Sequence, residues 1–356
     1  MFKILDRYII GKFLGTYVFA IILILAITVM FDINEKLDAF LKAPLKATVF
    51  DYFMNFLPYF ANQFSPLFTF IAVIFFTSKL ADNSEIIAML STGMSFRRLL
   101  RPYLVGATVI AAATFVLSAY IIPPANVKRI DYTNTYVKNR RVDYGTNIQL
   151  QVGPGQIAYM SRYDNTTRTG FKFSLETFKD KKLVSRLTAQ TIKWDTLYNW
   201  TVRDYMIRDF KGNREQIHRG NRLDTVIPIE PRDFLISRND HETLTTPQLR
   251  EYIARQRTRG VANIETFEIE NERRYAMTAA AFILTVIGMA LSSRKVKGGM
   301  GVNIGIGLVL SFSYIMFMSV TSSFAVSGLT SPMVAMWIPN LIYAVIAVVL
   351  YRRASR

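Results

Sequence analysis

The sequence contains no cysteine and only two histidines among its 356 residues. Without cysteine the chain can form neither a disulfide nor a zinc–thiolate site, and it has no thiol nucleophile. His218 and His241 do not stand in an HExxH pattern, and no GxxxxGK[ST] segment occurs. We therefore expect no metal, no cofactor and no catalytic residue, and any ATP hydrolysis linked to this chain would take place in another subunit.

Charged residues are missing from long stretches. Apolar runs of membrane length, almost free of charged residues, fall at about 10–31, 50–77, 103–122, 275–292, 302–326 and 333–351. Each is close to the roughly 20 residues that cross a bilayer as a helix. We predict six transmembrane helices, the first of them retained because no small-residue cleavage site follows it. Spans so poor in ionisable groups weigh against a proton- or sodium-coupled carrier.

The net charge of +17 is spread over alternate connections instead of forming one basic face. Since positive residues favour the cytoplasmic side of short loops, these connections and both termini are predicted to lie inside. The basic groups are Lys3, Arg7 and Lys12; Lys79, Arg97, Arg98 and Arg101; Arg294, Lys295 and Lys297; and Arg352, Arg353 and Arg356. Alternation then places the long polar insert, roughly 124–272, outside.

The insert changes from membrane-like to strand-like sequence. Short alternating runs rich in β-branched and aromatic residues are NIQLQV, QIAYMSRY, FKFSLETF, LVSRLTAQTIKWD and WTVRDYMIRDF, with turn formers such as GPG, DNTTRTG and KDKK between them. This pattern predicts an antiparallel β domain of the open-sandwich or jelly-roll type. The segment TLTTPQLREYIARQRTRG then predicts a short helix, because Pro247 suits a first helical turn. The expected fold class is an α-helical membrane protein with six transmembrane helices plus an inserted extracytoplasmic all-β, jelly-roll-like domain.

The stretch NSEIIAMLSTGMSFRRLLRP, residues 83–102, is too short and too basic to be a span. Asp82 and Glu85 resemble a capping box, and Gly93 suits the end of a helix. One apolar face is predicted from Ile86, Ile87, Leu90 and Met94. Two interpretations remain open: a helix lying in the head-group layer, or a coupling helix docked on a cytoplasmic motor.

Several segments resemble the lipopolysaccharide export permeases of the LptF/LptG (YjgP/YjgQ) family. The S-E-x(7)-G frame of Ser84, Glu85 and Gly93 looks like the family's coupling segment. LDRYI, LTTPQLREYIARQRTRG, NERRYAMTAAAFILTVIGMALS and MWIPNLIYAVIAVVLYRR resemble its opening, the helix before the fourth span, that span and the last helix. The pieces extend from residue 5 to residue 353, and they are similar to both paralogues.

The resemblance implies the permease subunit of an ATP-binding-cassette exporter in the bacterial inner membrane. Such a subunit extracts lipopolysaccharide from the outer leaflet and passes it to a periplasmic β-jelly-roll bridge protein. The implied partners are a paralogous six-helix permease and a cytoplasmic ATPase dimer. The expected parts are 1–123, with three spans and the coupling helix at about 82–93; 124–243, the periplasmic β domain; 244–272, a short helix and connection; and 273–356, the last three spans.

The resemblance gives the coupling role to Ser84, Glu85, Ile86, Ile87, Leu90 and Gly93. Topology places cations near the outer leaflet, where they are candidates for the anionic head group: Lys36, Lys42, Lys46, Lys128, Arg129, Arg273 and Arg274. Their alternative role is to anchor helix ends or to pair with Asp32, Glu35, Asp38 and Glu272. Candidates for an acyl-chain wall are Phe13, Phe19, Leu23, Phe312, Phe317 and Phe324, which could equally be ordinary packing residues.

The β domain offers a further apolar set that either binds lipid tails or fills a closed core: Ile148, Leu150, Ile157, Tyr159, Phe171, Phe173 and Leu175. Two other classes of protein remain as alternatives. A membrane-tethered β-domain sensor would need no coupling helix and would not co-purify with an ATPase. A lipid-modifying membrane enzyme lacks a convincing metal or nucleophile constellation in this sequence.

Overall fold

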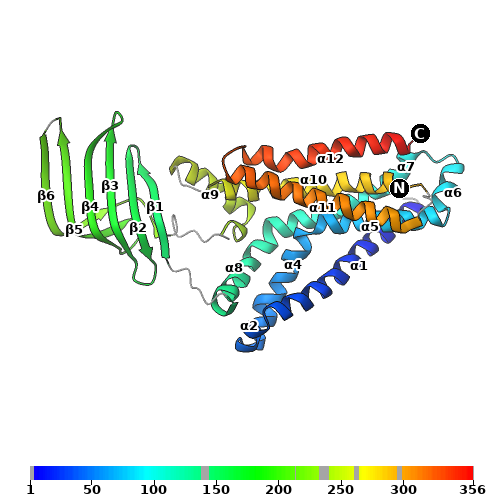
Figure 1. Ribbon diagram of the computed structural model, residues 1–356, viewed down its shortest axis with the longest axis horizontal. Coiled ribbons are helices and arrows are strands. Elements are labelled where there is room, and N and C mark those ends of the chain that lie inside the picture. Colours follow the sequence, from blue (N-terminus) through cyan, green and yellow to red (C-terminus); the bar gives the residue numbers. More distant parts are fainter. Residues whose placement is uncertain are drawn as a thin grey trace. The chain divides into compact units, whose positions relative to one another are not determined.

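The computed structural model describes residues 4–137, 144–212, 214–231, 240–259, 264–294 and 299–355 (Figure 1). The chain forms two compact units. The first, here called the membrane unit, comprises Met1–Val137, Glu242–Pro247 and Glu265–Arg356. The second, the β unit, comprises Lys138–His241 and Gln248–Ile264. The β unit is therefore an insertion in the sequence of the membrane unit. The segment Glu242–Pro247, here called the return segment, interrupts this insertion and belongs to the membrane unit.

Six helices in the described part of the chain are long and apolar enough to span a membrane, which confirms the six predicted spans. The main helices of the membrane unit are α1 (Ile4–Glu35), α5 (Ser65–Asp82), α7 (Phe96–Val116), α10 (Ile264–Ser292), α11 (Gly299–Val326) and α12 (Pro332–Ala354). A π-helical turn at Leu117–Ile121 joins α7 to α8 (Ile122–Tyr132), and helical structure continues to Val137. The third span therefore extends well past its predicted end at residue 122.

The second span is broken into two helical parts. A π-helical segment, Thr48–Phe53, leads into α4 (Met54–Gln63), and α5 begins at Ser65 after a break at Phe64. Pro66 lies in the first turn of α5, where its missing N–H costs nothing, whereas Pro58 lies inside α4. Two shorter helices, α2 (Leu37–Lys42) and α3 (Leu45–Ala47), precede this span.

Helix α5 is the most buried span, and its polar side chains are bonded to three neighbouring helices. Thr77 donates a hydrogen bond to the Tyr103 hydroxyl of α7 at 3.0 Å, and Ser78 accepts one from Asn303 of α11 at 3.2 Å. The Ser65 and Tyr17 hydroxyls lie 2.8 Å apart. Such bonds between helices satisfy polar groups that lipid cannot.

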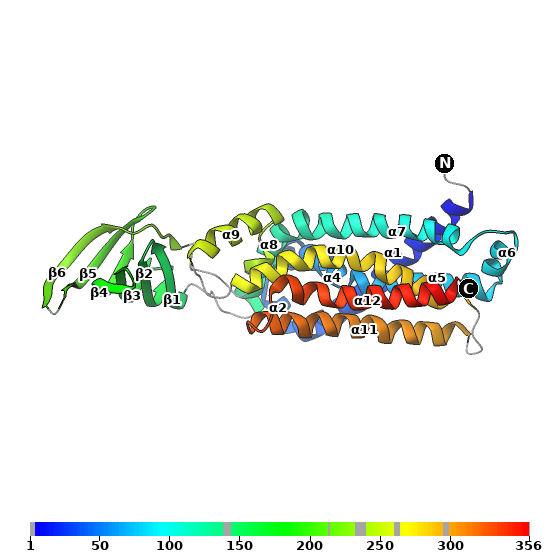
Figure 2. The same ribbon diagram turned by 90° about the horizontal axis from the view of Figure 1, so that it is seen from above.

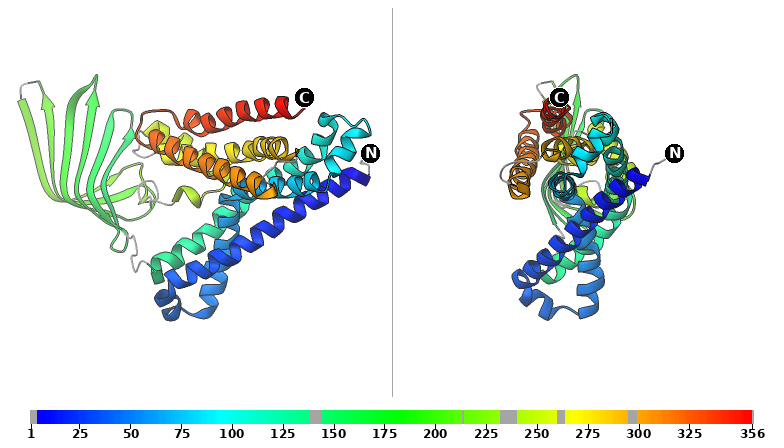
Figure 3. Two further views of the ribbon diagram at one scale, coloured as in Figure 1. Left: turned by 45° about the vertical axis from the view of Figure 1, so that its right-hand side comes forward. Right: turned by 90° about the vertical axis from the view of Figure 1, so that its right-hand side faces the viewer.

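Two groups of helices diverge toward one end of the membrane unit. Figure 3 shows α1, α2, α4 and α8 leaning away from α11 and α12, while α6 (Glu85–Ser91) lies at the opposite end. The beginning of α1 and the end of α12 are also at that opposite end (Figures 1 and 2). We call these the α2 end and the α6 end. The shared end of both termini and α6 agrees with the alternation of the basic connections.

The β unit contains a six-stranded antiparallel sheet in sequential order, shown in Figure 2. The strands are β1 (Tyr144–Gly153), β2 (Gln156–Asp164), β3 (Thr169–Lys179), β4 (Lys182–Trp194), β5 (Asn199–Lys211) and β6 (Arg214–Val226). All five predicted strands and their turns are confirmed. The sequential order of these six strands is a meander, without a crossing connection between them. Strand β6 was missed, because this edge strand is largely exposed and polar and lacks apolar alternation.

The apolar side chains of the sheet gather on one face around Trp200 and Tyr163. Ile148, Leu150 and Phe173 are buried there, and Leu175 packs against them. The prediction was wrong for Ile157, Tyr159 and Phe171, which are not part of this cluster. In β2 the pairing of Leu150 with Ala158 puts Ala158 and Met160 on the core face and turns Ile157 and Tyr159 away from it. In β3, Lys172 has a φ of +51°, which interrupts the alternation between Phe171 and Phe173.

The short helices also differ in detail from the sequence prediction. Helix α9 (Thr246–Arg259) begins at the predicted threonine and proline. Helix α6 begins without the predicted capping box: Ser84 is its N-cap, with a φ of 61° and no side-chain cap bond. Instead of completing a capping box, the Glu85 carboxylate accepts a hydrogen bond from the Asn83 side chain at 3.2 Å. Gly93 has a φ of +86° and ends this segment, as predicted.

We predict that Gly106→Leu in α7 disrupts the contact between α7 and α1. A Cβ at this position would lie 2.5 Å from the Phe13 ring, which is fully buried, so the helices would have to separate. Overpacking of this kind costs about 1–3 kcal/mol. The thermal midpoint of the purified protein should therefore fall. Gly15→Leu in α1, with nothing within 4 Å of its Cβ position, is the control, and an equal fall in both variants would contradict the proposed contact.

Candidate functional site

Helix α6 presents different residues to its own unit and to the outside. Ile86 is 1% exposed and belongs to the core formed by α1, α5 and α7, with Leu90 packed beside it. Ile87 points away and is 58% exposed. The predicted apolar face is therefore divided: Ile86, Leu90 and Met94 anchor the helix, whereas Ile87 is available to a partner.

An ion pair joins the start of α7, which follows α6 in the chain, to helix α1. Arg98, at the start of α7, donates two hydrogen bonds to the Asp6 carboxylate at 2.8 and 2.7 Å. The Tyr8 hydroxyl of α1 donates to Glu85 at 3.4 Å. Arg98, one of the basic residues predicted to lie on the cytoplasmic side, is thus paired with an acid. The only hint in the sequence was a lone acid in a basic N-terminus, 92 positions away.

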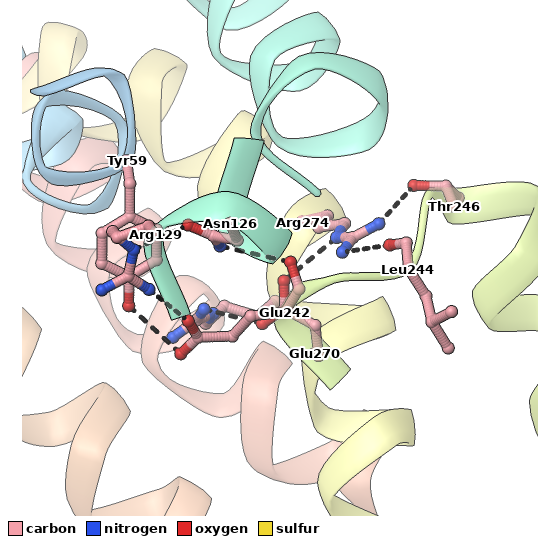
Figure 4. Close-up of polar contacts among 9 residues, drawn as sticks. Tyr59, Asn126, Arg129, Glu242, Leu244, Thr246, Glu270 and Arg274 are labelled. Atoms are coloured by element: carbon pink, nitrogen blue, oxygen red, sulfur yellow. Dashed lines mark hydrogen bonds and ion pairs between the residues drawn. The ribbon is translucent and has the colours of Figure 1, made fainter. Parts of the chain in front are cut away.

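At the α2 end, Glu242 is held by groups from two helices, as Figure 4 shows. Arg129 of α8 donates a hydrogen bond to its carboxylate at 3.0 Å, and the Tyr59 hydroxyl of α4 donates to it at 3.2 Å. Asn126 donates to the Glu242 backbone carbonyl at 3.2 Å and accepts from Arg129 Nε at 3.0 Å. The Arg129 guanidinium also lies 4.2 Å from the centre of the Tyr59 ring, a cation–π contact.

A second arginine binds the same return segment from α10. Arg274, whose side chain is 2% exposed, donates to Glu270 at 3.0 Å, to the Thr246 hydroxyl at 2.9 Å and to the Leu244 carbonyl at 3.0 Å (Figure 4). Arg273 pairs with the other oxygen of Glu270 at 2.6 Å. The contacts of Arg129 and Arg274 together connect α4, α8, the segment Glu242–Pro247 and α10. We call them the return-segment network.

A cavity of about 40 Å³ adjoins this network. Its walls include the broken end of α4, the first turn of α5 and the charged groups of α10. Asn62 is buried in this wall, and its side-chain oxygen has no hydrogen-bond partner among the residues that the structure describes. A polar cavity of this size has room for ordered water, which would satisfy that oxygen.

The seven candidate head-group cations fall into two sets. Four have acidic partners: Lys36, Arg129, Arg273 and Arg274. Lys36 binds Asp32 and donates to the Tyr52 hydroxyl at 2.6 Å, beneath the rings of Tyr52 and Phe56. The other three, Lys42, Lys46 and Lys128, are exposed at the α2 end, and no acid among the described residues pairs with them. The predicted topology placed all seven cations at one depth in the membrane but could not separate the two sets.

The candidates for an acyl-chain wall divide in a similar way. Phe19, Leu23, Phe312 and Phe324 are exposed on α1 and α11, and Phe317 is half-buried. Phe13 does not belong to such a wall, which corrects the prediction: it is completely buried against Gly106 and Tyr103. The residues described include no group of three or more His, Asp or Glu side chains that could hold a metal ion.

These features define a multi-pass membrane protein with an inserted extramembrane β domain. The family model of the lipopolysaccharide export system permease LptF/LptG matches residues 7–353, so the chain belongs to this family. A comparison with curated proteins gives no match. Family membership makes the chain a lipopolysaccharide export permease, a transport subunit of the inner membrane that works with a paralogous permease.

We predict that Arg274→Met destabilises the membrane unit strongly. The change leaves the Leu244 carbonyl and the Thr246 hydroxyl without their donor and removes one partner of Glu270. Loss of one partner of a buried ion pair costs about 3–5 kcal/mol. The thermal midpoint in detergent is the measurement. Arg255→Met, which breaks an exposed pair with Glu251, is the control, and equal stability of the two variants would refute the structural role of Arg274.

Proposed function

We propose that this permease subunit extracts lipopolysaccharide from the outer leaflet of the inner membrane and passes it to a periplasmic bridge protein. A separate dimeric ATPase on the cytoplasmic side drives the cycle through α6. Both termini and α6 would then be cytoplasmic and the β unit periplasmic. The observation that carries the proposal is the division of α6, with Ile86 anchored in the core and Glu85 and Ile87 at its accessible surface.

A motor can move a membrane helix only through a contact that is rigid on the permease side. The Asp6–Arg98 pair and the burial of Ile86 supply this rigidity, since the pair joins α7 to α1 and Ile86 attaches α6 to their shared core. Ile87 supplies an apolar side chain that can enter a groove of the partner, and Glu85 supplies a charge. A basic residue of the ATPase is the expected partner of Glu85.

We predict that Glu85→Gln and Glu85→Arg leave membrane insertion intact and reduce export, with Arg the more damaging. Reversal places two like charges in a partly desolvated contact, whereas Gln retains hydrogen bonding. Reversing the charge of the basic ATPase partner should partly rescue Glu85→Arg. Export is measured at native expression together with ATPase stimulation. Normal export by Glu85→Arg would exclude the coupling role of this residue.

Two matched variants of α6 distinguish a loss of ATPase coupling from a loss of folding stability. Ile87→Asp should lower ATPase recovery and stimulation while the thermal midpoint of the permease stays constant. Ile86→Asp should lower the thermal midpoint itself, because an unpaired carboxylate would be buried. Identical behaviour of the two variants would show that α6 has no distinct partner face.

The exposure of the spans indicates which surface of this chain would contact the paralogous permease. Of the six spans, α1 and α11 have the smallest buried fractions within this chain. Both expose large apolar side chains, among them Phe19, Ile22, Val309 and Met316. We infer that these two spans face the second permease and, between the subunits, the acyl chains of the transported lipid. The six-stranded sheet, with its exposed edge strand β6, suits strand addition by a β-rich bridge protein.

Head-group binding is assigned to the three unpaired lysines at the α2 end. Lys42 ends α2, Lys46 lies in α3 and Lys128 lies in α8, so all three belong to the group of helices that diverges from α11 and α12 (Figure 3). A phosphate-bearing head group could bind these lysines directly, because no ion pair with a described acidic residue would have to break first. Charge-assisted bonds of this kind contribute about 1.5–3 kcal/mol each.

We predict that replacing Lys42, Lys46 and Lys128 together with Gln lowers photocrosslinking of lipopolysaccharide severalfold without loss of assembly. The three side chains supply the accessible positive charge, so their removal weakens attraction to the anionic head group. Lys36→Gln is the control: it lies on the same side but is already bound to Asp32, so it should affect stability more than crosslinking. Unchanged crosslinking by an assembled triple variant would exclude this site.

A further inference from the structure

An apolar groove of about 430 Å³ runs between α7, α10 and α12 on the surface of the membrane unit. Its walls include Leu100 of α7, Phe282 and Val286 of α10, and Ala344 and Val348 of α12. The groove is lined by different helices from the lysines and the exposed α1 and α11 surfaces discussed above. It is therefore separate from the proposed path of the transported lipid.

One end of the groove is cationic. Arg352, in the last turn of α12, lines the groove next to Tyr351, and it is exposed. Arg97, also exposed, lies one turn before Leu100 toward the beginning of α7. Both arginines lie at the α6 end of their helices (Figure 2). No acidic side chain in the described part of the chain pairs with either arginine.

We propose that this groove binds one acyl chain of an anionic phospholipid from the leaflet at the α6 end. The apolar walls would contact the chain, and Arg352, assisted by Arg97, would contact the phosphate. Tyr351, an aromatic residue with a polar tip, stands where the apolar and polar parts meet, as tyrosines do at membrane interfaces. The pattern of one apolar trough and one cationic end matches the two parts of such a lipid.

The dimensions of the groove suit one acyl chain. From Ala344 to Arg352 the wall of α12 is about 12 Å long, at about 1.5 Å per residue. The volume of about 430 Å³ falls within the range of about 300–1,000 Å³ found for sites of small molecules.

The position of the charge favours a phospholipid over lipopolysaccharide. Both lipids carry acyl chains and phosphate, so the chemistry of the contacts alone does not distinguish them. The cationic end of the groove lies at the α6 end, whereas Lys42, Lys46 and Lys128 lie at the α2 end (Figure 1). A lipid whose head group reaches the α2 end cannot place its phosphate on Arg352. The inference does not depend on the proposed coupling mechanism.

The test compares lipid retention by the full chain, purified with its partner subunits. Samples are washed in detergent, incubated with phosphatidylglycerol or phosphatidylcholine, and analysed by quantitative mass spectrometry of the bound lipid. Val348→Trp fills the groove, and Arg352→Gln removes its charge. The matched controls are Val349→Trp and Arg353→Gln, which change neighbouring exposed residues that do not line the groove.

We expect each groove variant to lower phosphatidylglycerol retention at least fivefold and each control to change it less than twofold. Arg352→Gln should not alter retention of phosphatidylcholine, and excess lipopolysaccharide should not displace phosphatidylglycerol. Unchanged retention in both groove variants would overturn the proposal. So would displacement by lipopolysaccharide, or a photoreactive residue at position 348 that crosslinks to a polypeptide instead of to phospholipid.

Discussion

The fold depends on the attachment of the return segment Glu242–Pro247 to the membrane unit. Charged groups at the end of a helix bundle are costly to bury unless each finds a partner. Arg129 and Arg274 meet this requirement from two sides, one through Glu242 and the other through Glu270, Thr246 and the Leu244 carbonyl. The segment thus joins α4 and α8 to α10 at the end where the other helices diverge. An inserted β unit can then leave and rejoin the chain without separating the first three spans from the last three.

The same network explains how a broken helix is tolerated in a membrane protein. The interruption between α4 and α5 frees backbone groups that lipid cannot satisfy, and such breaks persist only where protein or a hydrated cavity surrounds them. Here the break opens onto the cavity beside Glu242 and Glu270, where the buried Asn62 side-chain oxygen has no partner among the described residues. Pro66 in the first turn of α5 and the ion pairs of the return-segment network therefore act at the same place: together they allow a helix break to exist inside the membrane unit.

Sequence alone predicted the features that depend on neighbours along the chain. The six spans follow from uninterrupted apolar runs, and five strands follow from alternation; β6 escaped because an exposed edge strand has no apolar face to alternate. The site was less predictable, because its contacts join distant positions. Asp6 and Arg98 are 92 residues apart and Arg129 and Glu242 are 113 apart, so no local pattern reports them. Hydropathy gives the depth of a residue in the membrane, but it does not say which face of a helix meets another helix, as Phe13 and Phe19 illustrate.

The predicted topology placed arginines and lysines at the same depth, but their side-chain chemistry gives them different roles. At the α2 end the arginines Arg129, Arg273 and Arg274 all have carboxylate partners, whereas the lysines Lys42, Lys46 and Lys128 are exposed. A planar guanidinium donates in several fixed directions, so it can hold a carboxylate, a hydroxyl and a carbonyl at once, as Arg274 does. A flexible, strongly hydrated ammonium suits a ligand that must be bound and then released. Lys36 is the exception, held by Asp32 and two aromatic rings. At the α2 end, arginines therefore hold the packed helices together, whereas exposed lysines remain available to bind and release a lipid.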